Sequence, residues 1–272
     1  MSARGGEPRP WGCRTVAAVS DLLVRMIGWP ALILHGDPCV TDRWIWLRRR
    51  LRAPGARTLD AGAGNGGFAI YTARLGNESV GLSFASDEIA AARRRAAALG
   101  VHGVDFRVGD LRRLDEIAGD LGRFDQIVCL EVAEHIRDDT KLIADLARLL
   151  NPGGRLLLTT PSVEHRALWS ESLSETEDGG HVRWGYSHEE MARLFTGAGL
   201  RVVDQGYVSG FVSQRLTNLM RRAQRVSFVL GWALVMPLRV LQLLDRPVTR
   251  MLGWPPLCIA VVGERPAPTA RR

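Results

Sequence analysis

The chain has 272 residues, 46% of them apolar, and a formal net charge of +7, which fits a globular protein with one sizeable α/β domain and additions. The uncharged apolar run at residues 226–238 is 13 residues long, too short for the roughly 20 residues that cross a bilayer. The four cysteines, Cys13, Cys39, Cys129 and Cys258, form no Cys-x-x-Cys pair, so we expect reduced, packed thiols.

The first 52 residues are predicted to form a polar tail followed by a helical cap. Residues 1–10 are polar and contain Gly and Pro, and we expect them to be disordered. Residues 13–35 have an amphipathic helical pattern that breaks near Pro30, and residues 41–52 predict a second helix. Charged residues interrupt the apolar stretch of this cap, unlike in a signal peptide, so we expect a cytoplasmic protein that can associate with a membrane.

From residue 53 to residue 207, short apolar runs alternate with helical patterns, and a last apolar run lies in the C-terminal segment 253–272. The predicted strands are residues 57–61, 79–83, 104–108, 124–130 and 155–160, a sixth that begins at 200–203, and a last one at 257–262. The predicted helices are residues 65–75, 86–98, 138–150 and 187–198. This alternation predicts an α/β fold with a mostly parallel seven-stranded sheet and helices on both faces.

The most informative segment follows the first predicted strand. Asp60 ends an apolar run, and glycine then stands at every second position, as Gly62, Gly64 and Gly66, before a helical pattern. Without a Cβ, glycine lets the backbone turn sharply and approach a ligand closely. A strand, a glycine loop and a helix N-terminus in this order predict a site for a nucleotide-like ligand.

Residues 208–252 interrupt the alternation with apolar residues at helical spacing, and Pro237 is expected to kink or end a helix there. Residues 213–250 contain seven arginines and one acidic residue, and so carry +6 of the net charge. Two interpretations of this basic amphipathic insertion stay open. It is either a helical pair packed on the core or on a second subunit of a homodimer, or a peripheral membrane element whose arginines meet lipid phosphates.

Between residues 58 and 203 the chain resembles the class I S-adenosylmethionine (SAM) methyltransferases, and the segment that begins at Asp60 is similar to their motif I. The resemblance implies a Rossmann-like fold and SAM as the cofactor, with the glycine loop holding its methionine part. It also implies cofactor contacts from residues that follow the second, third and fourth strands. These are Ser83 and Phe84, Asp110 and Leu111, and Glu131.

Ser83 departs from the family pattern, which usually has a carboxylate at this position to bind both ribose hydroxyls. A serine hydroxyl makes one such hydrogen bond rather than two charge-assisted ones. We therefore expect weaker SAM binding unless Asp87 contributes. Because of this departure, a second interpretation stays open, in which the protein is a module that binds SAM without catalysing a reaction.

Glu131, Glu134 and His135 form a Glu-x-x-Glu-His element similar to that of small-molecule methyltransferases, including the ubiquinone-pathway O-methyltransferases. His181 stands in a segment that resembles the one over the acceptor pocket of these enzymes. A hydroxyl acceptor must lose a proton to a base or a metal, and His135 and His181 are the candidate bases. The three residues are spaced at i, i+3 and i+4, so we expect them to share one helix face and to form with His181 a candidate site for Mg²⁺ or Mn²⁺.

The resemblance implies a SAM-dependent methyltransferase, and we expect O-methylation of a lipid-linked or hydrophobic small molecule at a membrane surface. The alternative acceptor is a soluble sugar or secondary metabolite, with the insertion as a dimer interface. The Asn/Asp-Pro-Pro-Tyr/Phe motif of enzymes that methylate amide or exocyclic amino nitrogens is absent after the fourth strand. Because the arginines of the insertion lie among aliphatic residues, we expect no nucleic-acid partner.

Overall fold

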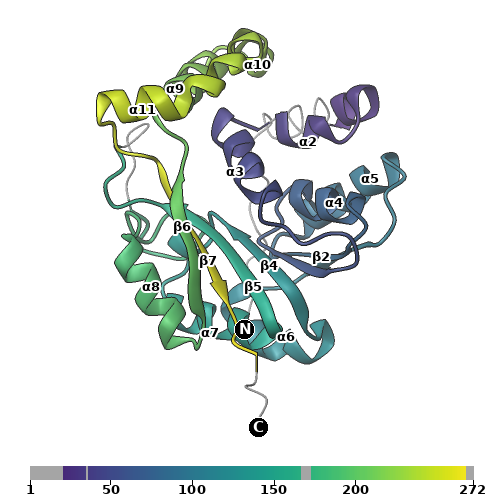
Figure 1. Ribbon diagram of the computed structural model, residues 1–272. Helices are drawn as coiled ribbons and strands as arrows, with labels where there is room; N and C mark the ends of the chain where they lie inside the picture. Colours follow the sequence, from purple (N-terminus) through teal and green to yellow (C-terminus); the bar gives the residue numbers. More distant parts are fainter. Residues whose placement is uncertain (1–20, 35, 167–172, 268–272) are drawn as a thin grey trace.

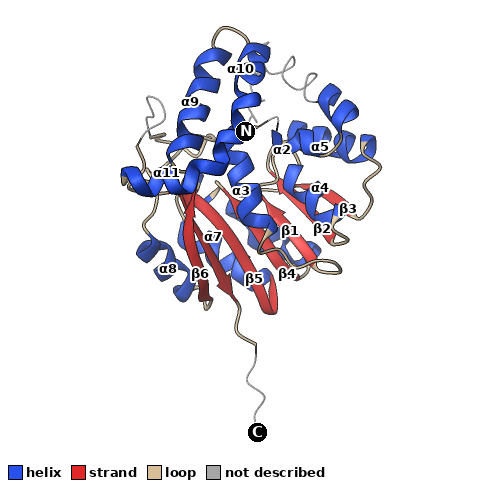
Figure 2. Ribbon diagram, turned by 45° about the horizontal axis from the view of Figure 1, so that its top comes forward, coloured by secondary structure: helices blue, strands red, loops and turns tan. Residues whose placement is uncertain are grey.

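The structure is a computed structural model that describes residues 21–34, 36–166 and 173–267. Its centre is a seven-stranded sheet in the order β3-β2-β1-β4-β5-β7-β6 (Figures 1 and 2). The strands are β1 (Arg57–Ala61), β2 (Glu78–Ser83), β3 (Val104–Val108), β4 (Phe124–Leu130), β5 (Leu150–Pro161), β6 (Arg201–Val208) and β7 (Cys258–Glu264). Only β7 runs antiparallel to its neighbours β5 and β6, so the predicted mostly parallel sheet is confirmed.

Helices cover both faces of this sheet, as the alternation predicts. They are α2 (Pro30–Leu34), α3 (Pro38–Arg48), α4 (Gly67–Arg74), α5 (Ser86–Ala98), α6 (Leu114–Leu121), α7 (Asp139–Leu149) and α8 (His188–Gly197), with the 3-10 turns η1 (Leu111–Arg113) and η2 (Ala133–His135). Helix α6, a short helix that contains Gly119, was not predicted from the sequence. Residues 21–27 are also helical, and the predicted break near Pro30 lies just after them. The predicted tail at residues 1–10 lies outside the described residues.

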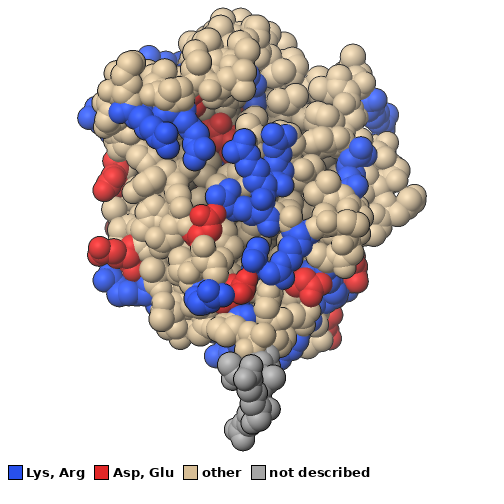
Figure 3. All heavy atoms as spheres, in the orientation of Figure 1, with Lys and Arg blue, Asp and Glu red and all other residues tan. Residues whose placement is uncertain are grey.

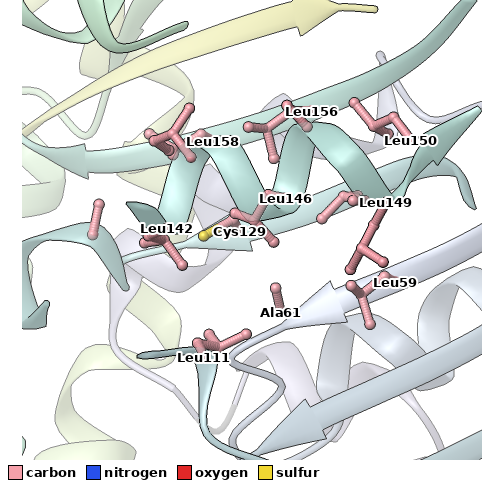
Figure 4. Packing of buried hydrophobic residues seen from close by; sticks show 14 of the residues in the cluster. Leu59, Ala61, Leu111, Cys129, Leu142, Leu146, Leu149, Leu150, Leu156 and Leu158 are labelled. Atoms are coloured by element: carbon pink, nitrogen blue, oxygen red, sulfur yellow. The ribbon is translucent and has the colours of Figure 1, made fainter. Parts of the chain in front are cut away.

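The core explains why these helices lie where they do. Strand side chains alternate between the two faces of the sheet, and Leu59 of β1 and Leu158 of β5 are fully buried in the layer that also contains Leu142 and Leu146 of α7 (Figure 4). Fully burying each such leucine contributes about 2 kcal/mol. The cysteines Cys39, Cys129 and Cys258 are free and buried, as predicted, and Cys13 falls outside the described part of the chain.

The insertion contains more helices than the predicted pair. It consists of α9 (Phe211–Gln224), α10 (Phe228–Val235), η3 (Pro237–Leu244) and α11 (Asp245–Leu252), which lie together above one end of the sheet in Figure 1. Pro237 follows the end of α10, as expected. Across the described ranges no single helix is long and apolar enough to cross a bilayer, although α10 and the segment 237–252, bent by 51°, together meet that test of length and composition.

The insertion is held to α3 by buried polar contacts. Arg239 is buried and donates to Thr41 Oγ1 at 2.6 Å and to the carbonyl of Gly36, so this arginine does not belong to the exposed basic surface. Gln242 Nε2 donates to Asp42 Oδ1 at 3.0 Å. Burial, together with the nearby carboxylate of Asp245, raises the pKa of Asp42 to about 6. The insertion and the N-terminal cap therefore meet at a carboxyl group whose pKa is higher than that of an exposed aspartate.

We predict that Asp42→Asn removes a pH dependence of stability. Because the pKa of Asp42 is higher in the folded state than its ordinary value of 3.8, its stabilising contribution is complete below about pH 4 and is lost as the pH rises to about 6. The free energy of unfolding of the unsubstituted protein should fall by ~2 kcal/mol relative to the variant over that range, since one pKa unit corresponds to ~1.4 kcal/mol. Urea unfolding at pH 4, 5, 6 and 7 measures this difference, and parallel pH profiles of the two proteins would contradict it.

Candidate active site

The loops after β1 and β4 meet at the point where the strand order reverses, which is where open α/β sheets bind their ligands. Gly62 has a φ of 92°, and a Cβ on it would lie 2.4 Å from Val132 Cγ2. Gly66 has a φ of 81°, and a Cβ there would lie 2.7 Å from Ala92 Cβ. These two positions require glycine for both conformation and space. At Gly64, by contrast, a Cβ would meet no heavy atom closer than 4.0 Å, so its open side is available to a ligand.

Asp60 is buried at the end of β1 and anchors the helix that follows the loop. Its Oδ2 accepts a hydrogen bond from the backbone N–H of Ala69 at 3.0 Å. Burial raises the pKa of Asp60 to about 7. A positively charged ligand beside this carboxyl group favours its ionised form, so the site fits SAM, which carries a sulfonium and an ammonium group.

The carboxylate beside the end of β2 comes from Glu88, a residue that was not predicted from the sequence. The hydroxyl of Ser83 donates to Glu88 Oε2 at 2.9 Å, and Glu88 lies in the first turn of α5. The contact of Ser83 is thus with the residue after Asp87, and the contribution of Asp87 to SAM binding remains a prediction. The signal in the sequence that points to Glu88 is an acidic residue with a long side chain in the first turn of the helix after β2. Phe84, the predicted neighbour of the adenine, is 65% exposed.

Asp110 and Leu111 lie after β3, where the sequence placed them. Asp110 caps η1 by accepting from the backbone N–H of Arg112 at 2.9 Å, and it also forms an ion pair with that arginine. The hydrogen bonds from Arg112 hold the pKa of Asp110 below its ordinary value. Leu111 is buried in the core. The contacts of both residues with the adenine remain predictions.

Glu131 is held apart from the rest of its predicted element. It has a φ of 56° and precedes η2, so it does not share a helix face with Glu134 and His135, and that expectation is wrong. Its carboxylate accepts from Thr159 Oγ1 at 2.8 Å and from Cys258 Sγ at 3.3 Å. These contacts direct Glu131 toward β5 and β7.

Arg43 of α3 completes the surroundings of Glu131, and the sequence analysis missed it. Its NH1 lies 3.1 Å from Glu131 Oε2, and the side chain is 13% exposed. Burial alone would lower the pKa of Arg43, but the carboxylates of Glu131 and Asp37 outweigh that effect and raise it. Nothing in the sequence distinguishes this residue among 35 arginines.

The structure brings Glu134, His135 and His181 together. One possible ligand atom from each lies within 4.8 Å of the others. Glu134 is fully buried, and its Oε2 accepts from Thr160 Oγ1 at 3.1 Å, whereas Oε1 has no hydrogen-bond partner among the described residues. Burial and the nearby Glu131 raise the pKa of Glu134 well above its usual range. Carboxylate and imidazole donors around an unsatisfied oxygen fit a divalent cation, with Glu131 outside the set.

The imidazole of His135 is oriented by the backbone. Its Nδ1 lies 3.0 Å from the carbonyl oxygen of Gly180, so that nitrogen carries the proton and donates. The other nitrogen, Nε2, lies 3.9 Å from Glu134 Oε1 and carries the lone pair when the ring is neutral. The ring centroid of His181 lies 4.8 Å from that of His135. This arrangement can accept a proton or bind a cation.

The comparisons with known proteins agree with this geometry. Residues 40–205, more than half of the chain, match the family model described as a methyltransferase domain. The chain belongs to the SAM-dependent methyltransferases. A ubiquinone biosynthesis O-methyltransferase of Xanthomonas axonopodis pv. citri is 32% identical over 187 residues, which cover 66% of this methyltransferase and 76% of the relative.

Solved structures show the same fold at low sequence identity. The N-methyltransferase NodS of Bradyrhizobium japonicum, in complex with S-adenosylhomocysteine, has a TM-score of 0.53 and 16% identity, and the match covers 85% of this methyltransferase and 89% of NodS. The cyclase SpnF has a TM-score of 0.59 and 21% identity, with 97% and 100% of the two chains covered. The predicted family, Rossmann-like fold and SAM cofactor are therefore confirmed.

We predict that Gly64→Arg abolishes SAM binding while the protein stays folded, because the long side chain fills the open side of the loop. Gly64→Ala is the matched control, since it carries the same strain at a φ of 49° but adds only a methyl group. Calorimetry with SAM measures binding, and thermal unfolding of both variants checks the fold. Equal SAM affinity of the two variants would contradict this account of the loop.

Proposed function

We propose that this methyltransferase transfers the methyl group to an oxygen atom of a lipid-linked or hydrophobic small molecule at a membrane surface. One observation carries the chemical part of the proposal: the glycine loop at Gly62 touches Val132, two residues before Glu134 and three before His135. A methyl donor in that loop and a proton acceptor on the next one therefore stand side by side. The relative from Xanthomonas, named as an O-methyltransferase, supports the same acceptor atom.

Proton removal falls to the histidines in this mechanism. SAM, when bound, supplies a methyl group already activated by the positive sulfur. The chain must then place the acceptor oxygen in line with it and take up the hydroxyl proton. His135 Nε2, whose lone pair is left free by the bond from Nδ1 to Gly180, is suited to this step, with His181 as its neighbour. A divalent cation held by Glu134, His135 and His181 would instead lower the pKa of the acceptor hydroxyl.

We predict that His135→Gln and His181→Gln each lower kcat by about 10²-fold or more without weakening SAM binding, because general-base catalysis contributes about 10²–10⁴-fold. Transfer of labelled methyl from SAM to prenylated quinone precursors, glycolipids and polyketide-like compounds provides the assay. Treatment with a chelator should leave the activity of the unsubstituted protein unchanged. Loss of that activity, with recovery on adding Mg²⁺ or Mn²⁺, would show that a bound cation rather than a histidine base activates the acceptor hydroxyl.

The membrane part of the proposal rests on the surface of the insertion. Val226 and Leu243 are each 80% exposed and Met251 is 77% exposed, although they are large apolar side chains. Exposed apolar patches of this kind mark interaction sites. In Figure 3 the surface over α9 to α11 carries few charges at its top, and basic side chains gather below it. An apolar tip with a basic border fits an anionic lipid surface.

We predict that Val226→Glu combined with Leu243→Glu lowers flotation with vesicles that contain phosphatidylglycerol by at least tenfold, because two charges would replace exposed apolar side chains of the insertion. Val203→Glu, which changes an exposed apolar residue on β6 outside the insertion, is the control and should float normally. Light scattering tests the competing dimer interface. If the double variant floats unchanged, or if it only converts a dimer into a monomer, the membrane proposal is wrong.

A further inference from the structure

Two arginines outside the candidate active site stack on one indole ring. The guanidinium carbon of Arg166, in the segment after β5, lies 4.2 Å from the ring centroid of Trp254. The guanidinium carbon of Arg215, in α9, lies 4.9 Å from it. Both arginines are exposed, and neither forms an ion pair with any residue in the described ranges. Two positive charges are therefore gathered on one side chain without a carboxylate to balance them.

The indole that carries these arginines is fixed in place. Trp254 Nε1 donates to Gln214 Oε1 at 3.0 Å, and Gln214, which is fully buried, donates in turn to the carbonyl oxygens of Ser209 and Pro255. Phe211 packs edge-on against the same indole, with 5.1 Å between the ring centroids. A guanidinium stacked on a rigid ring keeps the N–H groups of its edge free to donate. The two arginines are thus held for binding rather than used by the fold.

The stack joins helix α9 of the insertion to the chain segments that lead to β5 and β7. Pro161 of β5 pairs with Cys258 of β7, and Cys258 also contacts Glu131 in the site. Trp254 comes four residues before Cys258, and Arg166 comes five residues after Pro161. Four extended residues span at most about 14 Å, so the backbone of Trp254 lies within that distance of the backbone of Cys258.

We propose that Arg166 and Arg215 together bind the phosphate group of a phosphate ester. Guanidinium edges match phosphate oxygens with paired, charge-assisted hydrogen bonds, and an anion shared between the two arginines removes the repulsion of their charges. The phosphate would belong either to the methyl acceptor or to a membrane lipid beside it. In this assignment of the phosphate the proposal rests on the proposed function.

Two binding arms distinguish these sources. Calorimetry with glycerol 3-phosphate tests a soluble phosphate ester, with glycerol as the uncharged control. Sedimentation with phosphatidylcholine vesicles, with and without phosphatidic acid at fixed salt, tests a lipid phosphate. Binding in the first arm assigns the site to a soluble phosphorylated molecule, and binding in the second arm alone assigns it to a headgroup.

Three variants test the site itself. Arg166→Gln with Arg215→Gln should weaken binding at least tenfold in the positive arm, and the neutral change Trp254→Leu should weaken it similarly by releasing the arginines. Arg49→Gln with Arg193→Gln removes the same charge from exposed positions outside the insertion and should weaken binding less than threefold. Equal losses in the two double variants, or no binding by the unsubstituted protein in either arm, would overturn the proposal.

The outcome does not depend on catalysis. SAM affinity, measured by calorimetry on the same proteins, should be unchanged in every variant, because none of these residues lies in the cofactor loop. If the unsubstituted protein methylates no tested acceptor but still binds phosphate through the stack, the proposed function fails and the phosphate site stands. If methyl transfer occurs but the stack binds no phosphate, the phosphate site is wrong and the proposed function stands.

Discussion

The close approach of the Val132 side chain to the backbone at Gly62 is the constraint on which the site depends. A methyl group at Gly62 would overlap Val132, so the loop after β1 can lie against the segment after β4 only because position 62 has no side chain. That contact sets the cofactor loop beside the segment that carries Glu134 and His135. Asp60 then fixes the helix after the loop through the N–H of Ala69.

A second set of contacts joins the surface helices to this centre. Arg43 of α3 pairs with Glu131, and the insertion is held on α3 by Arg239 and by the contact between Gln242 and Asp42. Breaking one partner of a buried ion pair costs several kcal/mol, because the other charge is left without compensation. The N-terminal cap, the insertion and the end of β4 are therefore joined by direct side-chain contacts.

The fold and the cofactor loop could be predicted from the sequence because both depend on local patterns. Apolar runs of strand length set the sheet, and the alternating glycines mark a loop whose conformation most other residues would strain. Helix α8 lies where the helical pattern predicts it, and a capping box formed by Ser187 and Glu190 begins it. Helix α3 starts earlier than predicted, because Asp37 caps it and Pro38 occupies its first turn.

Contacts between distant segments could not be predicted in the same way. The pairing of Arg43 with Glu131 joins residues far apart in the chain, and the conformation of Glu131 depends on its bond to β5 rather than on its neighbours in sequence. Glu88 was missed because the helix phase decides which of two adjacent acids faces Ser83. The likeness to a cyclase shows in addition that this fold alone does not determine the reaction.

Hydrogen exchange with and without S-adenosylhomocysteine tests the central claim most directly, because bound ligand slows the local opening of the segments it contacts. The account predicts slower exchange in residues 60–68 and 130–136 together, since the two loops form one site. Slower exchange in neither segment, or only in segments at the opposite end of the sheet, would contradict it.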